Sequence, residues 1–248
     1  MIVLLLGSGP AAMEARAWSR APFDRIVAIN NAWRVRPDWD DLIYPFDFPD
    51  DRMPPARAPQ QRFIDERDFV PANNAYGGFL YAGATMAFTA TYWALHELKP
   101  RVIAYFGCDM VYAPAGPTHF YGAGTADPLR ADPSLASLEA KSARARVLAA
   151  RQGCALVNLS RGPSRLIFER VGRDDLTGVA PPTWDHGALT EALKLEASLG
   201  YETPTGFHDH IEPDMAALRQ LDLLWIRASS GASTAKTGAR ARDSAVTK

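Results

Sequence analysis

The chain has 248 residues, of which 47% are hydrophobic and 22% are charged, and its formal net charge is −1. This composition is typical of a soluble globular protein with one large domain, with or without an appendage. The near-neutral charge argues against binding to nucleic acid or to an acidic membrane surface. No apolar stretch approaches the roughly 20 residues of a membrane span, and the N-terminal apolar run is too short for a secretory signal. Cys108 and Cys154 lie in apolar, strand-like contexts, which predicts buried thiols and a cytoplasmic protein.

The chain opens with a strand, a glycine turn and a helix. Residues 2–6 are uninterruptedly apolar, as in a strand buried on both faces of a parallel sheet. Gly7-Ser8-Gly9 breaks this strand, and residues 11–20 are expected to form a helix with Pro10 near its first turn. Amide groups and the helix dipole at such a turn favour a phosphate, and a tight turn without a ligand is the alternative.

The glycine turn does not match a standard NAD site. The dinucleotide fingerprint needs a third glycine, and here Ala11, Ala12 and Met13 follow the proline. The second expected strand, residues 24–30, ends in Asn30-Asn31 instead of the acidic residue that would bind a ribose. Two successive amides can hold a base or a ribose, or Asn30 closes an Asx-turn. These features favour a mononucleotide or a nucleotide-sugar.

The next elements alternate between strands and helices. Residues 42–44 are expected to form a third strand, and residues 45–61, with five prolines, a loop over the sheet edge or a lid. Residues 63–70 are ambiguous. Residues 80–98 are expected to form one buried helix that ends before Pro100, followed by a strand over residues 101–106.

A long loop then separates this unit from the last helix and strand of the sheet. Residues 110–132 are rich in glycine, proline and threonine, and a loop of this length suggests a functional role. Residues 133–152 are expected to form an amphipathic helix ending at Gly153, and residues 155–159 a strand. A helical stretch is expected over residues 166–170.

The expected fold is α/β and Rossmann-like, with a mostly parallel sheet, helices on both faces and a C-terminal helical extension. Residues 1–172 would form the nucleotide-binding domain. Residues 173–227 would form a helical cap or an interface for a homo-oligomer, with helices over residues 188–198 and 213–227. Residues 228–248 are small, polar and basic, which predicts a disordered tail.

Polar residues recur where the apolar runs stop, and ligands of open parallel sheets lie at those strand ends. Asp109 follows the strand 101–106 and could orient a sugar hydroxyl, bind a divalent ion or cap the next turn. His119 lies in the long loop, and its ordinary pKa near 6.5 suits proton transfer, although a loop histidine is often structural. His119 and Asp109 are the expected catalytic residues.

Two further constellations follow later in the chain. Ser160-Arg161 and Arg165 pair hydroxyls with guanidinium groups after a strand, either to bind a phosphate or carboxylate or to balance neighbouring acids. His208 and His210, with Asp214, have the side chains of a metal site but lack a spaced ligand set of known type.

Five short motifs occur in an order that resembles a known family. They are Gly7-Ser8-Gly9-Pro10, residues 29–33, residues 82–109, residues 118–122 and residues 160–165. The order resembles that of the bacterial CMP-sialic-acid-dependent sialyltransferases that modify lipooligosaccharides, and of related flagellin-modifying proteins. The similarity covers roughly residues 1–172.

The resemblance implies a Rossmann-like fold, a nucleotide near Ser8, Asn30 and Ala82-Gly83, and its phosphate near the loop after Asp109. It also implies direct displacement at the sugar with a general base. The family has asparagine where this chain has Ser8, and the family's catalytic histidine falls at Ala123. Either His119 takes over that role, or the protein binds without catalysing the reaction.

Three functional hypotheses follow. The first is a glycosyltransferase-like protein that binds a nucleotide-activated sugar, CMP-linked according to the resemblance, and transfers the sugar to a glycan acceptor, with no metal ligands assigned to it. The second is a non-catalytic nucleotide-binding module, and the third a metal-dependent hydrolase using His208 and His210. The residues expected to bind the nucleotide or its phosphate are Gly7, Ser8, Gly9, Asn30, Asn31, Gly83, Tyr121, Ser160 and Arg161.

Overall fold

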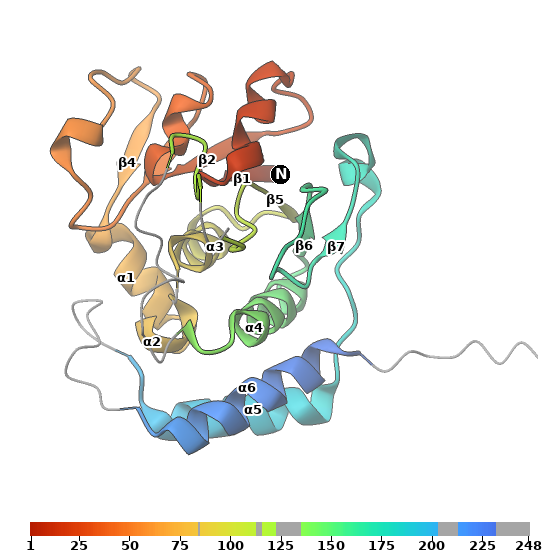
Figure 1. Ribbon diagram of the computed structural model, residues 1–248. Helices are drawn as coiled ribbons and strands as arrows, with labels where there is room; N and C mark the ends of the chain where they lie inside the picture. The colour runs from red at the N-terminus through yellow and green to blue at the C-terminus, as the bar shows by residue number, and fades with distance from the viewer. Residues whose placement is uncertain (84, 113–115, 123–134, 203–212, 232–248) are drawn as a thin grey trace, which may run out of the picture.

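The structure is a computed structural model, and it describes residues 1–83, 85–112, 116–122, 135–202 and 213–231. Within these residues, seven strands form a single sheet in the order β4-β3-β2-β1-β5-β6-β7 (Figure 1). Every pair of neighbouring strands is parallel, which confirms the expected Rossmann-like α/β fold. The strands are β1 (Ile2–Leu6), β2 (Arg25–Ile29), β3 (Asp41–Ile43), β4 (Arg62–Ile64), β5 (Val102–Phe106), β6 (Ala155–Asn158) and β7 (Glu169–Arg170).

β1 and β5 form the centre of the sheet. All five residues of each strand are buried, as expected for uninterrupted apolar runs that pack on both faces. From β1 the chain adds β2, β3 and β4 on one side, and then returns to add β5, β6 and β7 on the other. The strand order therefore reverses between β1 and β5, and their carboxyl ends open onto the crevice where doubly wound sheets bind ligands.

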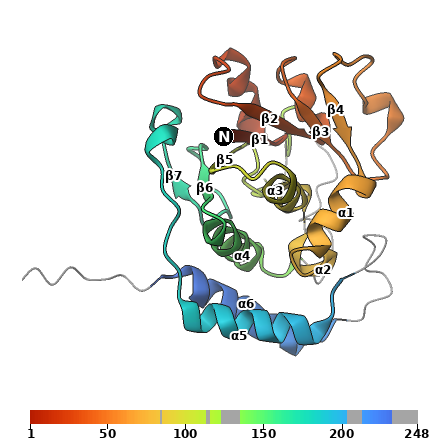
Figure 2. The ribbon, with the colours of Figure 1, turned by 180° about the vertical axis from the view of Figure 1, so that it is seen from behind.

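The two faces of the sheet are covered by different kinds of helix. Helices α1 (Glu66–Asn74), α3 (Met86–Glu97) and α4 (Leu138–Arg151) lie on one face (Figure 2). In the described part of the chain, the other face carries the 3₁₀ helices η1 (Pro10–Ala17), η2 (Asn30–Arg34) and η6 (Arg173–Gly178). The helix expected over residues 11–20 is thus the shorter and tighter η1, with Pro10 at its start as predicted.

The helix expected over residues 80–98 is interrupted. The structure has a short helix α2 (Phe79–Ala82) and a separate α3, because Thr85 is extended (φ −137°, ψ 159°) and begins a new helix. Residues 87–95 of α3 are all buried between the sheet and its neighbouring helices. The apolar run predicted one buried helix correctly only from Met86 onward, since periodicity does not reveal a break within an apolar run.

Three other expectations are corrected or refined. The ambiguous residues 63–70 divide between the end of β4 and α1, which begins with a capping box at Asp65. Residues 166–170 are not helical, because Glu169 and Arg170 pair with β6 as the edge strand β7. The proline-rich residues 45–61 form a loop whose regular element is the short 3₁₀ helix η3 (Asp50–Arg52).

The C-terminal helices α5 (His186–Leu199) and α6 (Met215–Ser229) form a layer outside α4, on the side away from the sheet (Figures 1 and 2). Trp225 of α6 is fully buried in the same core as α3 and α4, whereas Leu176 of η6 packs on the opposite face. The helical segment expected after residue 172 therefore shares its core with the sheet domain. Residues 228 and 229, expected to begin a disordered tail, belong instead to α6, where Ala228 is buried, and residues 232–248 lie outside the described residues.

Both cysteines are buried free thiols, as predicted. Burial raises the pKa of Cys154 to about 12, and that of Cys108 is raised further still. Neither thiol is therefore ionised near neutral pH. No helix among the described residues is long and apolar enough to cross a membrane.

Candidate functional site

A pocket of about 150 Å³ lies where the strand order reverses. The turn after β1, the end of β2, the start of α3 and the turn after β5 line it, together with part of the loop that follows β5. Seven of the predicted site residues meet in this way at the carboxyl edge of the sheet. They are Gly7, Ser8, Gly9, Asn30, Asp109, His119 and Tyr121, and Cys108 lines the pocket beside Asp109.

The two glycines of the first turn allow it to pack against the turn after β5. The amide of Gly7 donates to the carbonyl of Phe106, and the amide of Gly9 to that of Gly107, both at 2.8 Å. A Cβ on Gly7 would lie 2.6 Å from the Cys108 sulfur, and one on Gly9 2.8 Å from the Gly107 oxygen. These glycines are therefore needed for the close approach of two backbones, and their amides are engaged within the protein.

The N-terminus of α3 faces this pocket. Thr85, Met86 and Ala87 line it, and Thr85 is the N-cap of a 12-residue helix without a side-chain capping bond. The partial positive charge of a helix N-terminus favours an anion there. Sequence reasoning missed this element, although a threonine directly before an apolar helical run is a recognised start signal.

Asn30 and Asn31 differ in their surroundings. Asn30 lines the pocket and has a left-handed backbone (φ 51°), which asparagine tolerates better than most residues. Its Oδ1 is buried and has no hydrogen-bond partner in the part of the chain that the structure describes. Asn31 is 2% exposed within η2 and does not line the pocket. The Oδ1 of Asn31 is likewise buried without a partner among the described residues, so it is the pocket lining that makes Asn30 the amide of the pair that a ligand would reach.

The loop after β5 is attached to the glycine turn by a backbone hydrogen bond. The amide of Phe120 donates to the carbonyl of Ser8 at 3.0 Å, which brings His119 to the pocket. The His119 ring stacks on Tyr121 with 4.9 Å between ring centroids, and its Nδ1 lies 2.9 Å from the Thr118 hydroxyl. These contacts orient the imidazole. Ala123 lies outside the described residues.

Asp109 is held by the neighbouring strand end. The side-chain amide of Asn158, at the end of β6, donates to Asp109 Oδ1 at 3.2 Å and to the Ser164 hydroxyl at 3.0 Å. The Asn158 Oδ1 accepts from the amide of Ser160 at 2.9 Å. Asn158 therefore connects the turn after β5 to the loop after β6, a role that the sequence did not reveal.

Ser160 and Arg161 line a second pocket of about 800 Å³, between η1 and the segment after β6. The two pockets meet at Pro10, Asp109 and Val111, which line both. Gly83 lines neither of these pockets, and its carbonyl accepts from the Thr89 hydroxyl. The guanidinium of Arg165 donates two hydrogen bonds to Glu139. Arg165 therefore balances the charge of a neighbouring acid, the second of the two roles expected for it.

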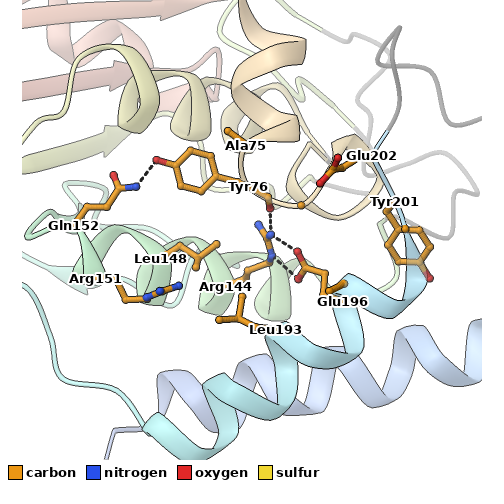
Figure 3. A pocket seen from close by; sticks show the side chains of 13 residues that line it. Ala75, Tyr76, Arg144, Leu148, Arg151, Gln152, Leu193, Glu196, Tyr201 and Glu202 are labelled. Atoms are coloured by element: carbon orange, nitrogen blue, oxygen red, sulfur yellow. Dashed lines mark hydrogen bonds and ion pairs between the residues drawn. The ribbon is translucent and has the colours of Figure 1, made fainter.

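A third pocket, of about 420 Å³, lies among α4, α5 and the end of α1 (Figure 3). Its buried charge is already neutralised, because the Arg144 guanidinium pairs with Glu196 and donates to the Tyr92 hydroxyl at 2.7 Å. Desolvation is the largest influence on Arg144 and lowers its pKa, but the charges and hydrogen bonds of Glu196 and Tyr92 together outweigh it and hold this pKa above its ordinary value. This network joins the C-terminal helices to α4 and has the character of a structural ion pair.

Of the three residues of the metal hypothesis, the structure describes Asp214 alone. His208 and His210 lie outside the described residues, and Asp214 caps α6 by accepting from the amides of Ala216 and Ala217. Among the residues that the structure describes, no three acidic, histidine or cysteine side chains gather as a metal-binding group.

The geometry thus places the predicted residues other than Asn31 and Gly83 in two adjoining pockets at the carboxyl edge of the sheet. No protein family, curated protein or solved structure matches this chain. The resemblance to the CMP-sialic-acid-dependent sialyltransferases therefore stays an expectation.

Proposed function

We propose that this chain is a glycosyltransferase-like protein that binds a nucleotide-activated sugar, CMP-linked, and transfers the sugar to an acceptor. The observation that carries the proposal is the convergence of the α3 N-terminus, the unsatisfied Oδ1 of Asn30 and the oriented His119 on one pocket. The helix N-terminus suits a nucleotide phosphate, and the amide of Asn30 suits a base or a ribose.

The two carboxyl-edge pockets adjoin, so a donor would extend from the smaller pocket toward the larger one. The pocket at the switch point, at about 150 Å³, is smaller than the roughly 300–1,000 Å³ of typical small-molecule sites. Its neighbour, at about 800 Å³, meets it at Asp109. The smaller pocket would hold the part of the nucleotide that contacts Asn30, and the sugar would lie toward Asp109, where the second pocket begins.

Transfer of the sugar requires a base near the acceptor. The acceptor oxygen forms a bond to the anomeric carbon while the bond from that carbon to the phosphate oxygen breaks, and CMP leaves with the bonding electrons. The proton of the acceptor hydroxyl passes to His119, the imidazole that lines the pocket. Asp109, fixed by Asn158, would orient the reacting hydroxyl.

Binding is tested by calorimetric titration with CMP, UMP, GMP and AMP. We expect CMP to bind and Asn30→Ala to weaken it about tenfold, the effect of losing roughly one good hydrogen bond. Asn74→Ala is the matched control, since this asparagine lies at the end of α1 and lines neither carboxyl-edge pocket. If none of the four nucleotides binds the wild type, the proposal is wrong.

Catalysis is tested separately by following the release of CMP from CMP-sialic acid in the presence of a glycan acceptor. Loss of a general base lowers rates by about 10²–10⁴-fold, so His119→Asn should abolish turnover but retain CMP binding. His96→Asn, at an exposed histidine on α3, is the control. If the wild type binds CMP without turnover toward any acceptor, the chain is the non-catalytic nucleotide-binding module.

A further inference from the structure

The second pocket has features of an anion site that the donor does not account for. It is lined by η1, the end of β5, the loop after β6 and the segment from β7 into η6. Its charged lining residues are Glu14, Asp109, Arg161, Arg170, Arg173 and Asp174. Because it meets the first pocket at Pro10, Asp109 and Val111, a ligand here would lie beside the reacting centre proposed above.

Ser160 supplies a buried hydroxyl without a partner. The residue is 4% exposed, and its Oγ has no hydrogen-bond partner in the described ranges of the chain. Its backbone is fixed on both sides, since its amide donates to Asn158 and its carbonyl accepts from Arg170 at 2.7 Å. A buried hydroxyl without a partner is unfavourable, and a ligand that accepts a hydrogen bond from it would remove this cost.

The three arginines of this pocket differ in their hydrogen-bond and ion-pair partners. Arg170 is bound to the Ser160 carbonyl, whereas Arg161 and Arg173 form no ion pair with any residue that the structure describes. The guanidinium of Arg173 lies 5.2 Å from the centroid of the Trp18 ring, and its Nη1 is buried without a hydrogen-bond partner within the described residues. Arg173 therefore presents an oriented and partly desolvated donor.

The acidic residues of the pocket do not neutralise these donors. Glu14 and Asp174 are exposed, where water screens their charge, and neither is paired with the three arginines in the described part of the chain. Asp109 accepts from Asn158 instead. Arg161 and Arg170 are exposed as well, so the donors in the less exposed part of the pocket are the Ser160 hydroxyl and the half-buried guanidinium of Arg173.

We infer that this pocket binds the second substrate, and that this acceptor is a sugar with an acidic group, a carboxylate or a phosphate. The identification of this ligand as the acceptor rests on the proposed transferase function. The acidic group would accept from Ser160 Oγ and from the guanidinium groups of Arg173 and Arg161. Guanidinium groups bind both anions through paired, charge-assisted hydrogen bonds. Ser160 and Arg161 are thereby assigned to the acceptor instead of to the nucleotide phosphate.

The inference is tested by titrating the full chain with glucuronic acid, glucose 6-phosphate and uncharged glucose. We expect one of the acidic sugars to bind at least tenfold more tightly than glucose, and the better of the two identifies carboxylate or phosphate. Arg173→Ala should weaken that binding at least tenfold, and Ser160→Ala should weaken it less. Arg34→Ala is the matched control, because Arg34 also lies over a tryptophan, Trp33, at 5.4 Å.

CMP titrated into the same variants separates the two claims. If CMP binds but neither acidic sugar binds better than glucose, the inference is wrong and the donor proposal stands. If an acidic sugar binds and CMP does not, the anion pocket stands and the donor proposal fails. If Arg173→Ala weakens CMP as strongly as it weakens the acidic sugar, Arg173 belongs to the nucleotide and the inference is overturned.

Discussion

Glycine residues allow the turn after β1 and the turn after β5 to approach each other closely. Gly7 and Gly107 sit opposite one another, with the amides of the first turn donating to the carbonyls of the second. Gly107 has a positive φ of 70°, and a Cβ on it would lie 2.9 Å from the Gly7 oxygen. The glycine turn therefore has a packing role in addition to any contact with a ligand.

Gly7→Ala should destabilise the protein by about 1–3 kcal/mol, as overpacking against backbone atoms usually does. Its Cβ would meet the Gly107 carbonyl and the Cys108 sulfur, and neither can move without shifting the turn after β5. Urea denaturation gives the free energy of unfolding. Gly178→Ala serves as the control, because nothing lies within 4 Å of a Cβ there. Equal stability of the two variants would contradict this role of Gly7.

Asn158→Ala should cost about 1–3 kcal/mol of stability, because the Ser160 amide and the Asp109 carboxylate lose their partner. The same change should also lower turnover, since Asp109 is no longer oriented. Asn158→Asp keeps the acceptor for Ser160 but places a second carboxylate beside Asp109. Denaturation midpoints and rates of CMP release measure the two effects, and unchanged turnover in both variants would remove Asn158 from the positioning of Asp109.

At the scale of elements, one buried ion pair joins the C-terminal helices to α4. The paired side chains of Arg144 and Glu196 (Figure 3) are 1% and 5% exposed. Glu196 also accepts from the Trp225 ring of α6 at 3.1 Å. One carboxylate therefore links α4, α5 and α6. A pair of this kind is strongly destabilising when one partner is removed, because the other charge stays buried.

Glu196→Ala should lower the free energy of unfolding by about 3–5 kcal/mol. Glu191→Ala is the matched control on the same helix, where an exposed carboxylate lies 3.9 Å from Arg227, and it should change stability by less than about 1 kcal/mol. Thermal unfolding monitored by circular dichroism distinguishes them. A small effect of Glu196→Ala would mean that the C-terminal helices are held by apolar packing alone.

For the whole molecule, paired carboxylates set the response to acid. Hydrogen bonds from Arg36, Arg67 and Arg165 lower the pKa of Asp38, Asp65 and Glu139, respectively. Each such group contributes stability above its ordinary pKa of 3.8 or 4.5, and that stability is lost as the pH falls through the lowered value. Asp222 acts in the opposite sense, because desolvation raises its pKa.

The melting temperature should therefore decrease as the pH is lowered below about 5, because the carboxyls with a lowered pKa outnumber Asp222, whose pKa is raised. Glu139→Gln should reduce the steepness of this fall by an amount equivalent to about 0.5 kcal/mol, because the pair with Arg165 is partly exposed. Adding Arg165→Ala to that variant should change the acid response little further. Calorimetric scans from pH 7 to pH 3 test this, and a steeper fall in Glu139→Gln would contradict it.

The sequence predicted the central sheet well and the edges poorly. Uninterrupted apolar runs such as residues 2–6 identify buried parallel strands, because both of their faces must be apolar. The two-residue strand Glu169–Arg170 has no such pattern and exists only through its pairing with β6. The break before α3 was also hidden within an apolar run, although it creates the helix N-terminus that faces the pocket.

The sequence by itself determined the α/β class, the parallel central strands and the turns at which polar residues gather. It did so because these follow from local apolar runs and from glycine and proline. Only the tertiary structure decided which of those polar residues meet. Asn30 and His119 share one pocket, whereas Ser160 and Arg161 line its neighbour, and Asn158 joins the two through Asp109. Such groupings depend on strand order and on the packing of loops distant in the chain, which local patterns do not encode.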